Sequence, residues 1–92
     1  MNPFHSSGMT SFQNAEAARE AGRAKAAHVA AEVRAEMGRQ GKTKGELARA
    51  LGVTINTAKS RYDGTQPYDL VELALVAMWL GVDLDAFAKD AA

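Results

Sequence analysis

The stretch TKGELARALGVTINTAKSRYDG, residues 43–64, decides the fold of this chain, because it carries the signals for two short helices and a turn between them. Thr43 and Glu46 have the spacing of a capping box, which predicts that a helix begins near Lys44. Gly52 supplies the left-handed residue that commonly ends a helix. Between these ends lies a short apolar stripe, made of Leu47, Ala48 and Leu51.

The second helix of this stretch is predicted over residues 55–62. Thr54 is its N-cap, and Val53 just before the cap can pack on Ala58 as a hydrophobic staple. The pair 63–64, Asp-Gly, ends the helix as a turn. Two helices joined by a short turn that contains Gly form a helix-turn-helix, whose second helix can enter the major groove of DNA.

The N-terminal part of the chain divides into a tail and a long helix. Residues 1–12 contain Pro, Gly and three Ser without periodicity, so we expect a flexible tail, followed by a single domain over 13–92. Residues 14–40 are rich in strong helix formers and predict one long helix, or two segments separated near Gly22. Two residues are available as its N-cap, Ser11 and Asn14. The core face of its second half is marked by Val29, Val33 and Met37.

Two more helices are expected after the central stretch. Asp69 and Glu72 repeat the capping-box spacing before an apolar run that ends at Gly81. The core face of that helix is predicted to contain Leu70, Leu73, Ala74, Ala77 and Leu80. Asp83 caps a last short helix with Leu84, Phe87 and Ala88. The fold class is therefore all-α, a compact bundle of about five helices with a central helix-turn-helix and an N-terminal helical extension.

The composition of the 92 residues excludes several kinds of protein. No cysteine is present, so disulfides and thiolate metal sites are ruled out. The longest apolar run, 73–80, is too short to cross a membrane, and we expect a cytoplasmic protein, associated with the nucleoid of a bacterial host. His5 and His28 are 23 residues apart, which is no metal-ligand spacing. Without a paired acid and base or an activated nucleophile, we expect no enzyme and no cofactor.

The charge is distributed unevenly, although the formal net charge is zero. Residues 34–66 carry seven basic against three acidic side chains, a net +4, whereas residues 67–92 carry one against five, a net −4. The first 33 residues balance. Because phosphate binding depends on a basic face rather than on the total charge, this division is compatible with nucleic-acid binding. The alternative is that these charged side chains lie on solvated helix faces and bind no ligand.

Several motifs stand at mutually consistent spacings: ELARALGV at 46–53 after Thr43, Thr54 and Thr57 in the second helix, Asp63-Gly64 and Pro67 in the loop, Leu73, Ala77, and LGVDLDAF at 80–87. Together they resemble the lambda-repressor-like helix-turn-helix domains, the XRE or Cro/repressor family, from about Val33 to Phe87. Arg61 and Lys42 depart from the family, which has apolar residues at both positions. The segment 56–62, NTAKSRY, also resembles the recognition helix of sigma-factor region four.

This resemblance implies a fold of five helices, with the third in the major groove of double-stranded DNA and the second across the phosphate backbone. It also implies transcriptional repression, usually by dimers on palindromic operators. The N-terminal helix before Val29 lies outside the resemblance.

The candidate DNA-binding residues follow from the apolar side of the second helix. Burying Val53, Ala58 and Tyr62 turns the other positions toward the groove. Asn56 can make paired hydrogen bonds to adenine, and Ile55 or Thr57 can cover a thymine methyl. Lys59 and Arg61 can read guanine or bind phosphate.

Further candidates lie at the helix starts and in the following loop. Lys44 matches a position where family members contact the DNA, and Thr43 with its free N–H groups can hold a phosphate. The complete set of candidates is Thr43, Lys44, Thr54, Ile55, Asn56, Thr57, Lys59, Ser60, Arg61 and Gln66.

Two functions are open at the level of sequence. The first is a repressor of the Cro or immunity-repressor type, encoded by a phage or another mobile element. The alternative is an antitoxin or protein-interaction module with autoregulatory DNA binding, in which residues 14–32 bind a protein partner. The sequence leaves monomer and homodimer open, with three candidate dimer surfaces: Trp79, Phe87 and the N-terminal helix.

Overall fold

The computed structural model describes the backbone of residues 7–88 and the side chains of residues 14–87. This part of the chain contains five α-helices and no strand, which confirms the all-α prediction. In chain order the helices are α1 (Ser7–Gln40), α2 (Lys44–Leu51), α3 (Ile55–Asp63), α4 (Leu70–Leu80) and α5 (Asp85–Ala88). None of them is long and apolar enough to span a bilayer.

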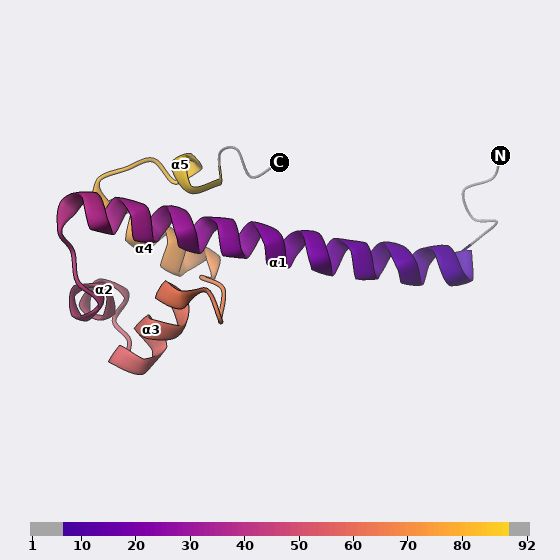
Figure 1. Ribbon diagram of the computed structural model, residues 1–92, viewed down its shortest axis with the longest axis horizontal. Helices are drawn as coiled ribbons and strands as arrows, with labels where there is room; N and C mark the ends of the chain where they lie inside the picture. Colours follow the sequence, from indigo (N-terminus) through magenta and orange to yellow (C-terminus); the bar gives the residue numbers. More distant parts are fainter. Residues whose placement is uncertain (1–6, 89–92) are drawn as a thin grey trace.

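Helix α1 is one continuous helix of 34 residues and sets the longest dimension of the molecule, 54 Å (Figure 1). It passes through Gly22 without a break, because a single glycine among alanines costs a helix only about 1 kcal/mol. The predicted tail is corrected in part: residues 7–12 are the first turns of α1, so Ser11 and Asn14 lie inside the helix rather than at its start. Residues 1–6 lie outside the described residues.

The four other helices gather around the second half of α1 only, so its first half projects from the globule (Figure 1). Residues 14–25 and Ala27 are exposed and Ala26 is half-buried, and we call residues 14–27 the α1 extension. The core begins two residues later, at Val29. Its buried residues are Val29, Val33, Met37, Leu47, Ala48, Leu51, Ala58, Val76, Ala77, Leu80 and Phe87.

The predicted ends of α2 and α3 are confirmed. Thr43 caps α2 with a complete capping box, and Gly52 ends it at φ 71°. Thr54 caps α3, and Gly64 ends it at φ 84°. A Cβ on Gly64 would lie 3.3 Å from the Cβ of Ala30, so the end of α3 packs directly on α1.

The predicted core face of α4 is wrong at its N-terminal end. Leu70 is 74% exposed and Ala74 is also exposed, as are Val71 and Met78 at 70% and 78%. Ala77 and Leu80 are buried as predicted, together with Glu72 and Val76. Because α4 is apolar almost all round, its hydropathy pattern has no clear phase, and contacts with other helices decide which side is buried.

Two of the three surfaces expected to form a dimer are also corrected. Phe87, on α5, is 2% exposed and is a core residue. Trp79 is half-buried, and its ring lies under the Lys42 ammonium, 5.6 Å from the ring centroid. Of these three surfaces, only α1 keeps a long exposed part.

Candidate nucleic-acid interface

Helix α3 rests on the rest of the domain through one side. Ala58 is fully buried, and Val53 and Tyr62 pack half-buried against the core, as the apolar positions predicted. Helices α2 and α3 contact each other, and α3 also packs on α1. The opposite side of α3 therefore faces solvent.

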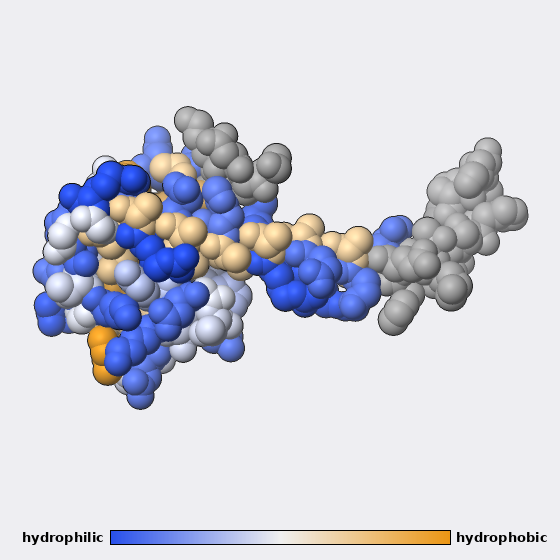
Figure 2. All heavy atoms as spheres, in the orientation of Figure 1, coloured by the Kyte–Doolittle hydropathy of each residue, from blue (hydrophilic) through white to orange (hydrophobic). Residues whose placement is uncertain are grey.

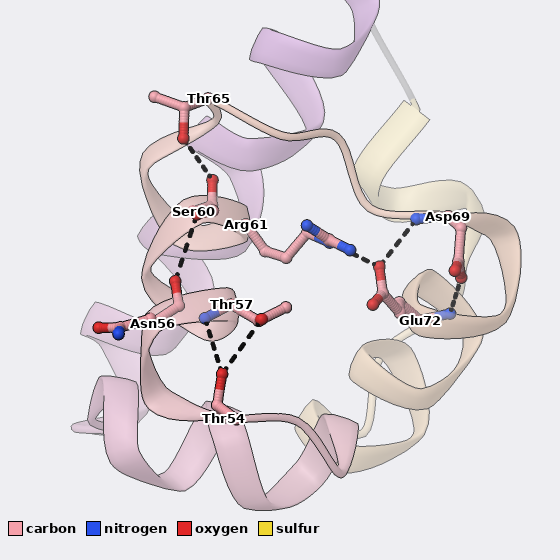
Figure 3. A network of polar contacts seen from close by, with 8 residues as sticks. All are labelled: Thr54, Asn56, Thr57, Ser60, Arg61, Thr65, Asp69 and Glu72. Atoms are coloured by element: carbon pink, nitrogen blue, oxygen red, sulfur yellow. Dashed lines mark hydrogen bonds and ion pairs between the residues drawn. The ribbon is translucent and has the colours of Figure 1, made fainter.

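The exposed side of α3 carries the residues expected to read bases. Asn56 and Lys59 are exposed, Ser60 is half-exposed, and Ile55 is 44% exposed at the start of the helix. Lys59 and Ser60 follow Asn56 by three and four residues, so both lie on the same face as Asn56. The Ser60 hydroxyl donates a hydrogen bond to the Asn56 carbonyl oxygen at 3.2 Å, which leaves the Asn56 amide side chain to point outward (Figure 3).

Thr54 and Thr57 are joined at the N-terminus of α3. The Thr57 N–H donates to Thr54 Oγ1 at 3.3 Å, and the Thr54 hydroxyl donates to Thr57 Oγ1 at 3.1 Å. Thr57 is half-buried. The two hydroxyls therefore fix the first turn of the helix, and the exposed Thr54 is the one better placed to meet a ligand.

Arg61 does not lie with the other candidates. Its Nε donates to Glu72 Oε1 on α4 at 2.8 Å, on the side of α3 away from Asn56 (Figure 3). The two side chains are only 20% and 11% exposed. The same Glu72 oxygen accepts the N–H of Asp69 at 3.0 Å, and the Glu72 N–H donates to Asp69 Oδ1 at 2.7 Å. Arg61 therefore links α3 to the N-terminus of α4 and lies apart from the exposed face of Asn56. The predicted contact of Arg61 with DNA stays a prediction.

This pair also explains how the charged side chain of Arg61 is accommodated between α3 and α4. The hydrogen bond from Arg61 to Glu72 raises the pKa of the Arg61 guanidinium, so the charge is held in the partly buried site. Glu72 completes the capping box of α4 at the same time.

Lys44 is exposed at the start of α2, and its ammonium lies 4.8 Å from the centroid of the Tyr62 ring. Arg34 approaches the same ring at 5.9 Å and donates from Nη1 to the Tyr62 carbonyl oxygen at 2.7 Å. The Tyr62 ring thus brings Lys44 of α2 close to the C-terminal end of α3. Arg34 was not among the sequence candidates, because no local pattern connects it to a residue 28 positions away.

The N–H of Thr43, predicted to hold a phosphate, is already bound to the carboxylate of Glu46. Glu46 Oε1 accepts the N–H of Thr43 at 2.8 Å, and the Glu46 N–H donates to Thr43 Oγ1 at 3.1 Å. The hydrogen bond from the Thr43 N–H holds the pKa of the Glu46 carboxyl below its ordinary value. A carboxylate therefore already occupies this N–H at neutral pH.

Gln66 is placed by the carbonyl oxygen of Ser60, at the end of α3. That oxygen accepts the N–H of Gln66 at 3.2 Å and the hydroxyl of Thr65 at 3.2 Å. Gln66 and Thr65 are both exposed, so the loop extends the surface of α3 toward α1. Asp63 is exposed too, and seven residues after Asn56 it lies on the same face, where it weakens attraction for phosphate.

The described residues contain no group of three acidic or histidine side chains that could hold a metal ion. Comparisons with protein-family models, with curated proteins and with solved structures found no match for this chain. Its function must therefore be argued from its own residues.

Proposed function

We propose that this chain binds double-stranded DNA by placing α3 in the major groove, and that it acts as a small transcriptional repressor of the Cro or immunity-repressor type. One observation supports this most strongly: α3 is buried on the side of Ala58 and presents Asn56, Lys59 and Ser60 on its exposed side. These side chains carry the donors and acceptors that read base edges and phosphates.

The electrostatics support the same proposal. Lys44 and Lys59 are both exposed, one at the start of α2 and one on the exposed face of α3, within the part of the sequence that carries the net +4. A basic face attracts DNA even when the whole chain is neutral.

The proposal is tested by selecting bound sequences from a random DNA pool, then measuring affinity for the selected operator by mobility shift. The variant Asn56→Ala plus Lys59→Ala is expected to abolish specific binding. A matched control is Asn14→Ala plus Lys25→Ala, which removes the same two chemical groups from exposed positions of the α1 extension. Full operator affinity in the α3 variant would contradict the role of α3.

A second function is favoured by the α1 extension. This helix segment is exposed over 14–25 and lies beyond the core, as an antitoxin or interaction module would require for a protein partner. Within the predicted partner surface 14–32, Val29 and Ala30 are instead buried in the core. Copurification of a second protein that depends on this segment would support that alternative. A selected palindrome without any copurifying protein would instead support a homodimeric repressor.

A further inference from the structure

The core-facing side of α1 continues into the α1 extension with a change of chemistry. From the C-terminal end, the residues of this side are spaced alternately by three and four: Met37, Val33, Ala30, Ala26, Arg23 and Arg19. Positions with this spacing lie on one face of a helix. The same face is therefore apolar where it packs on the domain and carries arginine where it passes beyond it.

These two arginines border a groove between α1 and the loop that joins α3 to α4. The groove has a volume of about 420 Å³ and is lined by Arg19, Gly22, Arg23, Ala26, Gly64, Thr65 and Pro67. Figure 2 shows hydrophilic side chains along this part of α1, on the side where α3 lies in Figure 1. The floor is made of small residues, so an elongated ligand can approach the backbone closely.

Both arginines are held along α1 by exposed ion pairs. Arg19 Nη2 lies 2.8 Å from Glu16 and is 56% exposed, and Arg23 Nη2 lies 2.8 Å from Glu20 and is 61% exposed. Exposed pairs of this kind contribute little to stability and exchange readily. A guanidinium pairs with a phosphate in the same bidentate geometry as with a carboxylate, so a phosphate can replace the glutamate.

We propose that Arg19 and Arg23 bind the phosphate backbone of the DNA that α3 reads, on the flank next to the α3–α4 loop. This inference rests on the proposed function. Three features select DNA as the occupant: two guanidinium groups that complement phosphate charge, their spacing of about 6 Å along the helix axis, and continuity with the exposed face of α3. Thr65, which lines the groove, donates its hydroxyl to the backbone carbonyl oxygen of Ser60, so the groove begins where α3 ends (Figure 3).

The test measures the salt dependence of binding by the full-length chain to two duplexes, the selected operator and a scrambled duplex of equal length. Arg19→Ala plus Arg23→Ala is expected to lower the slope of log K against log salt by about two and the affinity roughly ten- to hundredfold in 0.1 M salt, on both duplexes. Base preference is expected to remain unchanged, because phosphate contacts carry no sequence information.

Arg39→Ala is the matched control. Arg39 pairs with Glu36 at 2.8 Å three residues away on the same helix, is 63% exposed, and lies far from the groove. It is expected to change the slope by less than either groove arginine. A double alanine variant of Arg19 and Arg23 that is indistinguishable from Arg39→Ala, in a chain that binds its operator, overturns this inference and leaves the proposed function intact.

A second variant is expected to change the affinity and the salt slope in the opposite direction. Glu16→Gln plus Glu20→Gln frees both arginines and removes two repelling charges, so it is expected to tighten binding and steepen the salt slope. Unchanged binding in this variant, with unchanged helix content by circular dichroism, also counts against the phosphate contact. Absence of DNA binding by the unmodified chain would overturn the proposed function itself.

Discussion

At the residue scale, the pair of Arg61 and Glu72 is the main polar link between α3 and α4. The backbones of α3 and α4 do not approach each other closely, whereas α2 contacts both helices. The orientation of α3 relative to α4 therefore depends on this pair, on the loop 64–69, and on the shared neighbours α1 and α2.

Removing one partner of this pair is expected to destabilise the fold. Arg61→Met leaves the Glu72 carboxylate partly buried without its guanidinium, at a cost of about 2 kcal/mol in the free energy of unfolding, below the value for a fully buried pair. Arg61→Met with Glu72→Leu is expected to recover part of this loss. Urea titrations of the wild type, the single variant and the double variant measure it. Because Glu72 also completes the capping box of α4, the single variant Glu72→Leu is measured as well. A loss in the double variant equal to the sum of the two single losses would mean that the charges do not interact energetically.

Tyr68 is a second residue whose polar group affects the stability of the fold. Its hydroxyl is buried and has no hydrogen-bond partner among the described residues. Burial raises the pKa of the Tyr68 phenol above its ordinary value, and the nearby charge of Glu72 adds to this effect. An unsatisfied buried hydroxyl costs about 1–3 kcal/mol. The Tyr68 ring packs against the core, which offsets part of this cost.

Tyr68→Phe is expected to leave the stability at pH 7 unchanged or to raise it by about 1 kcal/mol. The pKa of Tyr68 is higher in the folded state than in the unfolded state. The stability linked to its protonation is therefore fully present below the unfolded pKa of about 10 and is lost as the pH rises above that value. Above pH 10 the unfolded phenol loses its proton first, and the wild type should therefore lose stability relative to the phenylalanine variant. Chemical denaturation between pH 7 and pH 11 checks this. A constant difference across that range would contradict it.

At the element scale, the residue that ends α3 must be glycine for two separate reasons, its backbone conformation and its closeness to α1. Gly64 has φ 84°, which side chains rarely adopt, and its backbone approaches Ala30 of α1. Gly52 and Gly81 also have positive φ, 71° in each case, but nothing lies within 4 Å of an added Cβ.

Gly64→Ala is therefore expected to cost more than Gly52→Ala. Both substitutions carry the left-handed penalty of about 1–2 kcal/mol, and only the first presses α3 against α1. Ala30→Gly should cost less in the Gly64→Ala background than in the wild type, because in that background it also removes the opposing methyl group. Thermal unfolding of the four variants, Gly52→Ala, Gly64→Ala, Ala30→Gly and the double variant, measures this. Equal losses of stability at positions 52 and 64 would show that α1 and α3 move apart to accept the added Cβ without a loss of free energy.

At the scale of the whole molecule, the structure divides into a packed domain and a projecting helix. The buried residues begin at Val29, and the α1 extension adds none of them. A helix without tertiary contacts is marginally stable, even when it is rich in alanine and ion pairs. The α1 extension is therefore the part of the described chain most open to ordering by a partner.

A fragment that starts at Ala24 is expected to unfold cooperatively with a free energy within about 1 kcal/mol of the full chain, because it keeps every core residue. In the full chain, amides of residues 14–25 should exchange with solvent much faster than those of residues 29–37. Calorimetry and hydrogen exchange test the two statements. Strong protection of residues 14–25 in the isolated chain would indicate that the α1 extension is already packed, as in a dimer.

Much of this architecture could be predicted from the sequence. Local patterns identify Thr43, Thr54 and Asp69 as N-caps and the residues after α2, α3 and α4 as terminating glycines, and the structure confirms both sets. Capping acts within one helical turn, so the residues that decide it are adjacent in the chain. The exposed face of α3 was predictable for the same reason, once Ala58 was placed in the core.

The amino-acid sequence by itself thus determined the number and ends of the central helices and the exposed face of α3. Only the tertiary structure decided which side of α4 is buried, that Arg61 faces Glu72, and that Arg34 holds Tyr62. These contacts join residues 11 and 28 positions apart, and Gln40 reaches the carbonyl oxygen of Leu80 across 40 positions. Local propensity and periodicity carry no information at such separations, because the partner is set by how the helices pack.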